Sequence, residues 1–166
     1  MTKKEMTEIF SVMMLAWPGH KMFEKATLQA TIELWTACLA DVDFWLAQQA
    51  VYRLCRECKF PPSIADFKEK ADNADHDVKA EIDNAFYHLK MIDDLYGEDK
   101  LYEKLDDRTR SVVDAMGGVQ SLTITSEHNG KTEYMWNLEG FKRTYESMIR
   151  GQSALPQMQQ KQIGGK

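Results

Sequence analysis

The sequence predicts an all-α protein, and three observations support this class. Apolar residues recur at helical spacing over most of the chain, residues that favour helix N-caps precede several of these runs, and Pro or Gly residues follow them. Hydrophobic residues make up 43% of the chain and charged residues 28%, as is ordinary for a globular protein. With 166 residues, the chain is long enough for one domain with a core or for a small domain with an appendage.

The strongest local signal is the stretch Lys59-Phe60-Pro61-Pro62, where one helix must end before another begins. Proline has no amide hydrogen and disfavours helical geometry in the residue before it, so the upstream helix ends by about Lys59. Ser63 is a favoured N-cap, and Asp66, three residues later, can complete a capping box. The stretch therefore predicts a bend between two helices.

Four helices are expected within residues 1–74, and their short connections predict that they pack as a compact N-terminal domain. The first helix is expected to be capped by Thr2 and broken by Pro18-Gly19, and the second is expected to run from Lys25 to Ala40. Asp41 or Asp43 is the expected cap of the third helix, and Ser63 is the expected cap of the fourth. The apolar residues expected to face the core of the first three helices are Met6, Ile9, Phe10, Met13, Ala16, Trp17, Leu28, Ile32, Trp35, Leu39, Phe44, Ala47, Val51, Leu54 and Cys58.

Residues 75–151 are expected to form a second helical region. The character of the sequence changes after about Asn73, and an amphipathic helix from His76 to Tyr96 is ended by Gly97. A further helical stretch from Glu98 to Met116, interrupted near Leu105-Asp106, is stopped by a pair of glycines.

Residues 121–136 leave two alternatives. Apolar and polar residues alternate there, and Asn129-Gly130 is a favoured tight-turn pair, which together favour a short β-hairpin; a loop is the alternative. Asn137 caps a final helix that ends near Gly151. The tail, residues 152–166, is rich in Gln and Gly and is expected to be mobile.

Charge is distributed unevenly along the chain. The net charge is −5, and residues 73–110 hold eleven acidic but only six basic side chains. Phosphate contacts need clustered Lys and Arg, so little or no direct nucleic-acid binding is expected and protein partners are favoured. No apolar run reaches the length of a membrane span, and no apolar signal core follows the N-terminus, so we expect a cytoplasmic protein without a membrane partner.

Cys55 and Cys58 are spaced like a metal-binding or redox pair. A structural zinc site usually needs a second pair of ligands at a matching spacing, and only Cys38 and four scattered histidines remain. A redox pair is expected at the start of a helix after a strand, whereas this pair lies late in a predicted helix. Buried or half-buried thiols are therefore the first interpretation, and a metal site or redox pair is the alternative.

Motifs of catalysis are missing from the sequence. It contains no Gly-rich phosphate loop, no nucleophile elbow, no zinc-protease helix and no calcium loop. Asp93-Asp94 and Asp106-Asp107 are adjacent acids that point in different directions on a helix, and they are interpreted as solvated helix surface. We therefore expect no cofactor and no enzymatic activity.

Four Trp and ten Met are many for a chain of this size, and most of them are expected in the core. A minority is expected on a recognition surface, where aromatic residues, Met and Arg are enriched. Phe44 and Trp45 are adjacent and cannot both face the same core, so one of them is a candidate contact. The candidate partner-binding residues are Phe44, Trp45, Phe60, Pro61, Pro62, Phe141, Lys142, Tyr145 and Arg150.

Two sets of residues resemble a known family. Trp35, Leu39, Asp41, the helix from Ala47 to Val51 and the block Lys59-Phe60-Pro61-Pro62-Ser63-Ile64-Ala65-Asp66 resemble the N-terminal domain of the phage replicative helicase loader and inhibitor family, over about residues 5–75. Leu105-Asp106-Asp107, the stretch from Val113 to Val119, Phe141 and Tyr145 resemble the C-terminal portion found in such phage replication proteins.

The resemblance implies an all-helical adaptor without enzymatic activity. It implies a protein that binds the hexameric replicative helicase, keeps it inactive, and delivers it to the phage origin through an origin-binding replisome organiser. It also implies that the C-terminal part engages the helicase and is flexible when free. The alternative is a phage-encoded interaction module that inhibits a host enzyme or serves as an assembly chaperone, since the acidic segment also suits a nucleic-acid mimic.

Overall fold

The computed structural model describes residues 1–128 and 131–152, with 126–128, 131–133 and 152 described by their backbone alone. Within this part the chain forms seven α-helices, two 3₁₀ helices and one two-stranded sheet, which confirms the predicted all-α class. The chain divides into two compact units, Met1–Ala80 and Glu81–Lys166. The predicted mobile tail lies outside the described residues, apart from the backbone of Gln152.

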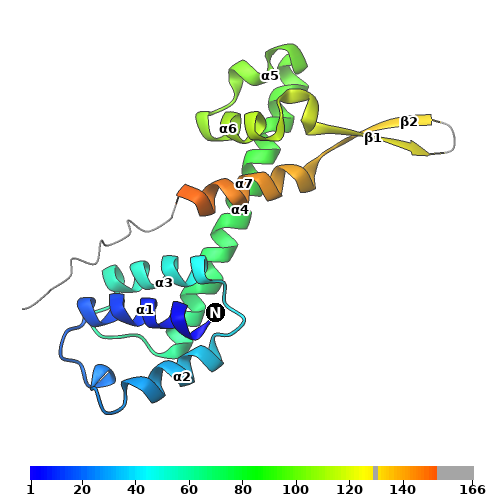
Figure 1. The fold of residues 1–166 in the computed structure, drawn as a ribbon. Coiled ribbons are helices and arrows are strands. Elements are labelled where there is room, and N and C mark those ends of the chain that lie inside the picture. The colour runs from blue at the N-terminus through cyan, green and yellow to red at the C-terminus, as the bar shows by residue number, and fades with distance from the viewer. Residues whose placement is uncertain (129–130, 153–166) are drawn as a thin grey trace, which may run out of the picture. The chain divides into compact units, whose positions relative to one another are not determined.

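Unit 1 contains the helices predicted around the proline corner (Figure 1). Its elements are α1 (Lys3–Ala16), η1 (Lys21–Phe23), α2 (Leu28–Cys38), α3 (Phe44–Glu57) and the first part of α4 (Ile64–Tyr96). The predicted cap of α1 is confirmed, because Thr2 and Glu5 form a reciprocal capping box. Of the two proposed caps of α3 the structure selects Asp43, whose carboxylate accepts a hydrogen bond from the Trp45 amide at 2.9 Å.

Aromatic rings from three helices form the centre of unit 1. The Trp35 ring on α2 meets Phe10 of α1 edge-on at 5.3 Å and Phe67 of α4 at 5.5 Å between ring centroids. Trp35 is 3% exposed, while Phe10 and Phe67 are almost completely buried. Edge-to-face pairs at these separations add to the free energy gained by burial alone. The Trp35 ring of α2 therefore contacts both α1 and α4.

The expectation of separate helices on either side of about residue 75 is wrong, because α4 runs without a break from Ile64 to Tyr96. No Gly or Pro lies between Ser63 and Gly97, and the polar residues around Asn73 weaken a helix without ending it. The change in charge along the sequence therefore marks a change in surface composition within one helix. The boundary predicted between residues 74 and 75 falls inside α4, and the compact units divide after Ala80.

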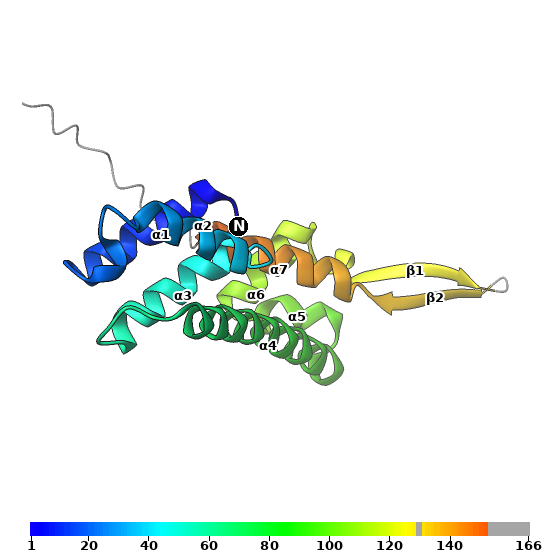
Figure 2. The same cartoon turned by 90° about the horizontal axis from the view of Figure 1, so that it is seen from below.

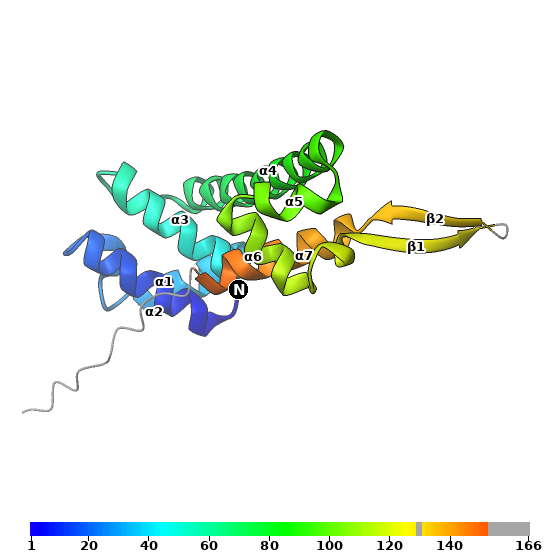
Figure 3. The same cartoon turned by 90° about the horizontal axis from the view of Figure 1, so that it is seen from above.

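Unit 2 begins in α4 and continues through α5 (Glu98–Lys104), α6 (Asp107–Met116), η2 (Val119–Leu122) and α7 (Leu138–Gln152). The predicted breaks at Gly97, near Leu105-Asp106 and at Gly117 are all confirmed, and Asp106 caps α6 by accepting two amide hydrogen bonds at 3.0 Å. Figure 3 shows α6 and α7 side by side. Among the described residues of this unit, the apolar side chains that are completely or almost completely buried are Leu89, Leu101, Val112, Val113, Leu122 and Phe141.

A β-hairpin interrupts the helices of unit 2, so the hairpin alternative is confirmed over the loop. Strands β1 (Thr123–His128) and β2 (Lys131–Trp136) pair antiparallel, with Ile124 opposite Met135. The hairpin projects beyond the helices of its unit (Figure 2). A lone pair of strands is only marginally stable, and this one is anchored at its base, where the Trp136 ring meets Phe86 of α4 at 5.9 Å.

Among the described residues, no helix combines the length and the apolar character needed to cross a bilayer.

Candidate protein-binding site

An open groove of about 420 Å³ lies in unit 1, where the end of α1 faces the connection from α3 to α4. We call it the proline-corner groove. It is lined by Ala16, Trp17, Pro18, Gly19 and His20 on one side and by Lys59, Phe60 and Pro61 on the other. Sites for small ligands usually enclose about 300–1,000 Å³, so the groove is large enough for the side chain of a partner.

The first wall of the groove follows from the way α1 ends. Trp17 closes the helix by donating its amide hydrogen to Met13 at 2.9 Å, and its side chain is 8% exposed. Pro18 cannot continue the helix, and Gly19 adopts a φ of 76°, which residues other than glycine rarely adopt. His20 then accepts a hydrogen bond at Nδ1 from the Met22 amide at 3.2 Å, which orients its imidazole ring.

The second wall follows from the two prolines. Pro62 is buried beneath the surface and Pro61 is half-buried, whereas Phe60 remains 69% exposed. The Lys59 ammonium lies 5.9 Å from the centre of the Phe60 ring, within the range of a cation–π contact. The corner therefore presents an aromatic ring and a positive charge on a backbone that the prolines restrict.

A capping box at the start of α4 holds the corner in place. Ser63 donates both its amide and its hydroxyl hydrogen to one oxygen of Asp66, at 3.0 and 2.7 Å, and its hydroxyl oxygen accepts from the Asp66 amide at 3.2 Å. The hydroxyl and amide donors of Ser63 lower the pKa of Asp66, because both favour the ionised carboxylate. The capping box predicted from Ser63 and Asp66 is thus confirmed.

The chemistry of the groove suits recognition of a peptide. Its lining is aromatic, aliphatic and cationic, and it includes no carboxylate. Among the described residues, no group of three or more His, Cys, Asp or Glu side chains is close enough to hold a metal ion. A partner segment with a large apolar side chain and a nearby carboxylate fits this combination of ring and cation.

The two spaced cysteines lie close to the groove in sequence but not in its lining. Cys55 and Cys58 are half-buried and pack against the core of unit 1. Burial raises the pKa of the Cys55 thiol, and the neighbouring Cys58 adds to the rise. A raised pKa disfavours the thiolate, which is the form that binds metals and attacks disulfides.

The structure brings only part of the predicted contact set together. Phe60 and Pro61 line the groove, whereas Phe44 and Trp45 are half-buried on α3 and lie outside its lining. In unit 2, Phe141 and Tyr145 are buried, Lys142 pairs with Asp83 at 2.8 Å, and Arg150 pairs with Glu146 at 2.7 Å. Their role in partner binding stays a prediction.

The sequence did not identify the Trp17 to His20 wall as part of a site. The signal in the sequence is the Pro18-Gly19 break, which by itself predicts only the end of a helix. Its position opposite Phe60 depends on how α1 packs against α3, which local patterns do not specify.

Comparison with known families connects unit 1 to phage replication. Residues 1–68 match the family model G39P_N (phage gene 39 protein, helicase loader/inhibitor N-terminal domain). This part of the chain is therefore similar to the N-terminal domain of that family, and it contains both walls of the proline-corner groove. Searches among curated proteins and solved structures found no match to the chain.

Proposed function

We propose that this protein is a non-enzymatic adaptor of phage DNA replication that works in the host cytoplasm. It binds a hexameric replicative helicase, holds it inactive, and delivers it to the phage origin through an origin-binding replisome organiser. The observation that supports this proposal is the match of residues 1–68 to a helicase loader and inhibitor domain. The proline-corner groove, with its exposed ring and its cation, supplies a contact surface on that same domain.

The adaptor acts by changing the conformational equilibrium of the ring. A protein without a nucleotide site can shift the conformation of a helicase only by binding one conformation of it more tightly than another. Release then requires a competing contact, and the replisome organiser supplies it. Copies that are linked to one another gain avidity on one ring without any new chemistry, because binding of the first raises the effective concentration of the next.

The experiment combines the purified full chain with the helicase of the phage and, separately, with that of its host. Size-exclusion chromatography measures complex formation, and ATPase and unwinding assays measure the activity of the ring. We expect co-elution with one helicase and a lower rate of ATP hydrolysis in the complex. Absence of co-elution with both helicases contradicts the proposal. Recovery of a nuclease, a polymerase or a tail protein from host lysate, in place of a helicase, favours the alternative of an inhibitor or assembly chaperone.

A further inference from the structure

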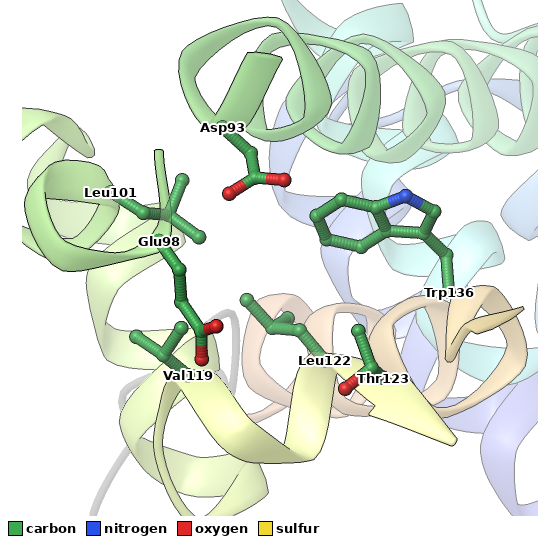
Figure 4. Close-up of a pocket in the computed structure, with 7 residues that line it drawn as sticks. All are labelled: Asp93, Glu98, Leu101, Val119, Leu122, Thr123 and Trp136. Atoms are coloured by element: carbon green, nitrogen blue, oxygen red, sulfur yellow. The ribbon is translucent and has the colours of Figure 1, made fainter. Parts of the chain in front are cut away.

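A small pocket in unit 2 combines an apolar wall with two carboxylates (Figure 4). The wall is formed by Leu101 of α5, Val119 and Leu122 of η2 and Trp136 at the end of β2, and Asp93 of α4 and Glu98 of α5 border the space. Figure 4 shows the Asp93 carboxylate pointing into the space between Leu101 and Trp136, and the Glu98 side chain reaching towards Val119. We call this the acid-lipped pocket.

The turn between α4 and α5 places both acids at the pocket. Gly97 has a φ of 77°, and its amide donates to the Asp93 carbonyl at 2.7 Å, which closes α4 and reverses the chain. Four residues of this turn are acidic: Asp93, Asp94, Glu98 and Asp99. Asp93 and Glu98 line the pocket, whereas Asp94 and Asp99 do not.

The two carboxylates of the pocket have no cation within the described part of the chain. Other acids of unit 2 do form ion pairs, as Glu81 does with Arg108 and Asp83 does with Lys142. The side-chain carboxylates of Asp93 and Glu98 accept no hydrogen bond and form no ion pair among the described residues. Asp93 is half-buried, so its charge is partly removed from water without a compensating partner.

The volume of the pocket limits what can occupy it. It encloses about 50 Å³, which is enough for a few water molecules or for the end of one side chain. Ligand sites for whole small molecules are larger, about 300 Å³ or more. The volume suits the end of one side chain of a partner, and the two carboxylates of the lining favour a positive charge at its tip.

We propose that the acid-lipped pocket is a receptor site for an arginine side chain on a partner protein. The guanidinium group is planar, donates from five N–H groups, and can both bridge two carboxylates and stack on an aromatic ring. Asp93 and Glu98 accept from it, Trp136 contacts its plane, and Val119 and Thr123, which keep exposed surface at the pocket, contact the aliphatic stem. The site is separate from the proline-corner groove and gives the chain a second contact surface. It prefers a positively charged partner group, whereas the groove suits a carboxylate.

The test uses the full chain and two blocked tripeptides that differ only in charge. The probe is acetyl-Leu-Arg-Leu-amide, and the control replaces arginine by the neutral isostere citrulline. Titrations are followed by the indole N–H resonance of Trp136 in a ¹⁵N spectrum, assigned from the signal that disappears in Trp136→Phe. We expect a saturable shift with the arginine peptide and at least about tenfold weaker binding of the citrulline peptide.

Matched variants separate the pocket from general attraction by acidic surface. Asp93→Asn with Glu98→Gln should weaken binding of the arginine peptide at least about tenfold, whereas Asp94→Asn with Asp99→Asn, which removes the same charge from the same turn, should change it by less than about twofold. If the first double variant does not fold, Glu98→Gln alone replaces it, since this side chain is exposed. Equal weakening by both pairs, equal binding of citrulline, or no shift at millimolar peptide overturns the proposal.

Discussion

The Tyr145 hydroxyl on α7 donates a hydrogen bond to the Glu81 carboxylate on α4 at 3.1 Å. The same carboxylate oxygen accepts from Arg108 of α6, so one acid joins three helices of unit 2. Tyr145 is 3% exposed, and burial, reinforced by the charge of Glu81, raises the pKa of its hydroxyl. A residue that the sequence suggested as a partner contact therefore has a structural role in the free chain.

Tyr145→Phe should destabilise the protein by about 1–2 kcal/mol. The substitution removes one hydrogen bond to a charged acceptor and leaves the buried ring in place. Denaturation of the full chain in urea, followed by circular dichroism, measures the change. Tyr87→Phe serves as the control because Tyr87 is 62% exposed and its hydroxyl makes no hydrogen bond among the described residues, so it should change the free energy of unfolding by less than about 0.5 kcal/mol. Equal effects of the two substitutions would contradict the role given to Glu81.

Phe60→Ala should weaken association with the helicase while leaving the fold intact. The ring is 69% exposed, so its removal opens no cavity, but it removes the largest apolar surface of the proline-corner groove. We expect about tenfold weaker binding or more, as for an aromatic anchor at an interface. Leu34→Ala is the control, because Leu34 is also exposed, at 57%, and lies on α2 outside the groove. Unchanged helicase binding by Phe60→Ala would remove the groove from the interface.

Local sequence patterns were enough to predict most of the elements. N-caps at Thr2, Asp43, Ser63 and Asn137, together with breakers such as Gly97, mark helix ends because they act within one turn of the chain. The same patterns do not predict that α4 is continuous, since the composition of the sequence changes near Asn73 although no breaker occurs there.

The sites were harder to predict than the elements. Phe60 and Pro61 are prominent in the sequence, but the opposite wall of their groove lies forty or more positions earlier in the chain. The acid-lipped pocket joins Asp93, Leu122 and Trp136, which meet only after several elements have packed. The spacing of Asp93 along its helix predicts solvated surface, because it does not reveal what later segments place beside it. Tertiary packing, which acts over long separations in sequence, decides both sites.

Stability should fall in acid partly through the capping box of α4. The folded-state pKa of Asp66 is lowered by its hydrogen bonds with Ser63, so the ionised form contributes stability above the unfolded pKa, about 3.9, and this contribution is lost as the pH falls through the lower folded value. Urea denaturation between about pH 5 and pH 2 should therefore show a decreasing free energy of unfolding, with a shallower decrease in Asp66→Asn.

Glu69→Gln is the charge-matched control for this pH series. Glu69 lies one turn further along α4, is exposed, and makes no hydrogen bond or ion pair among the described residues. It should retain the pH dependence of the unmodified chain. Part of the decrease in the free energy of unfolding should persist in both variants, because hydrogen bonds with Thr2 also lower the pKa of Glu5. The bond from the Thr2 amide contributes most to this lowering. If Asp66→Asn and Glu69→Gln change the slope equally, the capping box is not the source of the effect.

The start of α7 offers a test in which the sign of an effect reverses. The Asn137 carboxamide accepts from the Gly140 amide at 3.0 Å through its oxygen and donates to the Ser121 carbonyl at 3.0 Å through its nitrogen. A Cβ at position 140 would lie 2.5 to 2.7 Å from three atoms of that carboxamide. Gly140→Ala must therefore displace the cap and break both hydrogen bonds, although alanine is intrinsically the better helix residue.

A double-mutant cycle separates these two effects. Alone, Gly140→Ala should destabilise the protein, since losing the cap and the Ser121 bond, about 1–2 kcal/mol, outweighs the gain in helix propensity, at most about 1 kcal/mol. In an Asn137→Ala background the clash and the cap are both gone, so the same substitution should stabilise the protein by about 0.5–1 kcal/mol. Gly151→Ala, where no atom lies within 4 Å of the added Cβ, should have the same effect in both backgrounds. An equal effect of Gly140→Ala in the two backgrounds would show that the Asn137 side chain does not lie over Gly140 in solution.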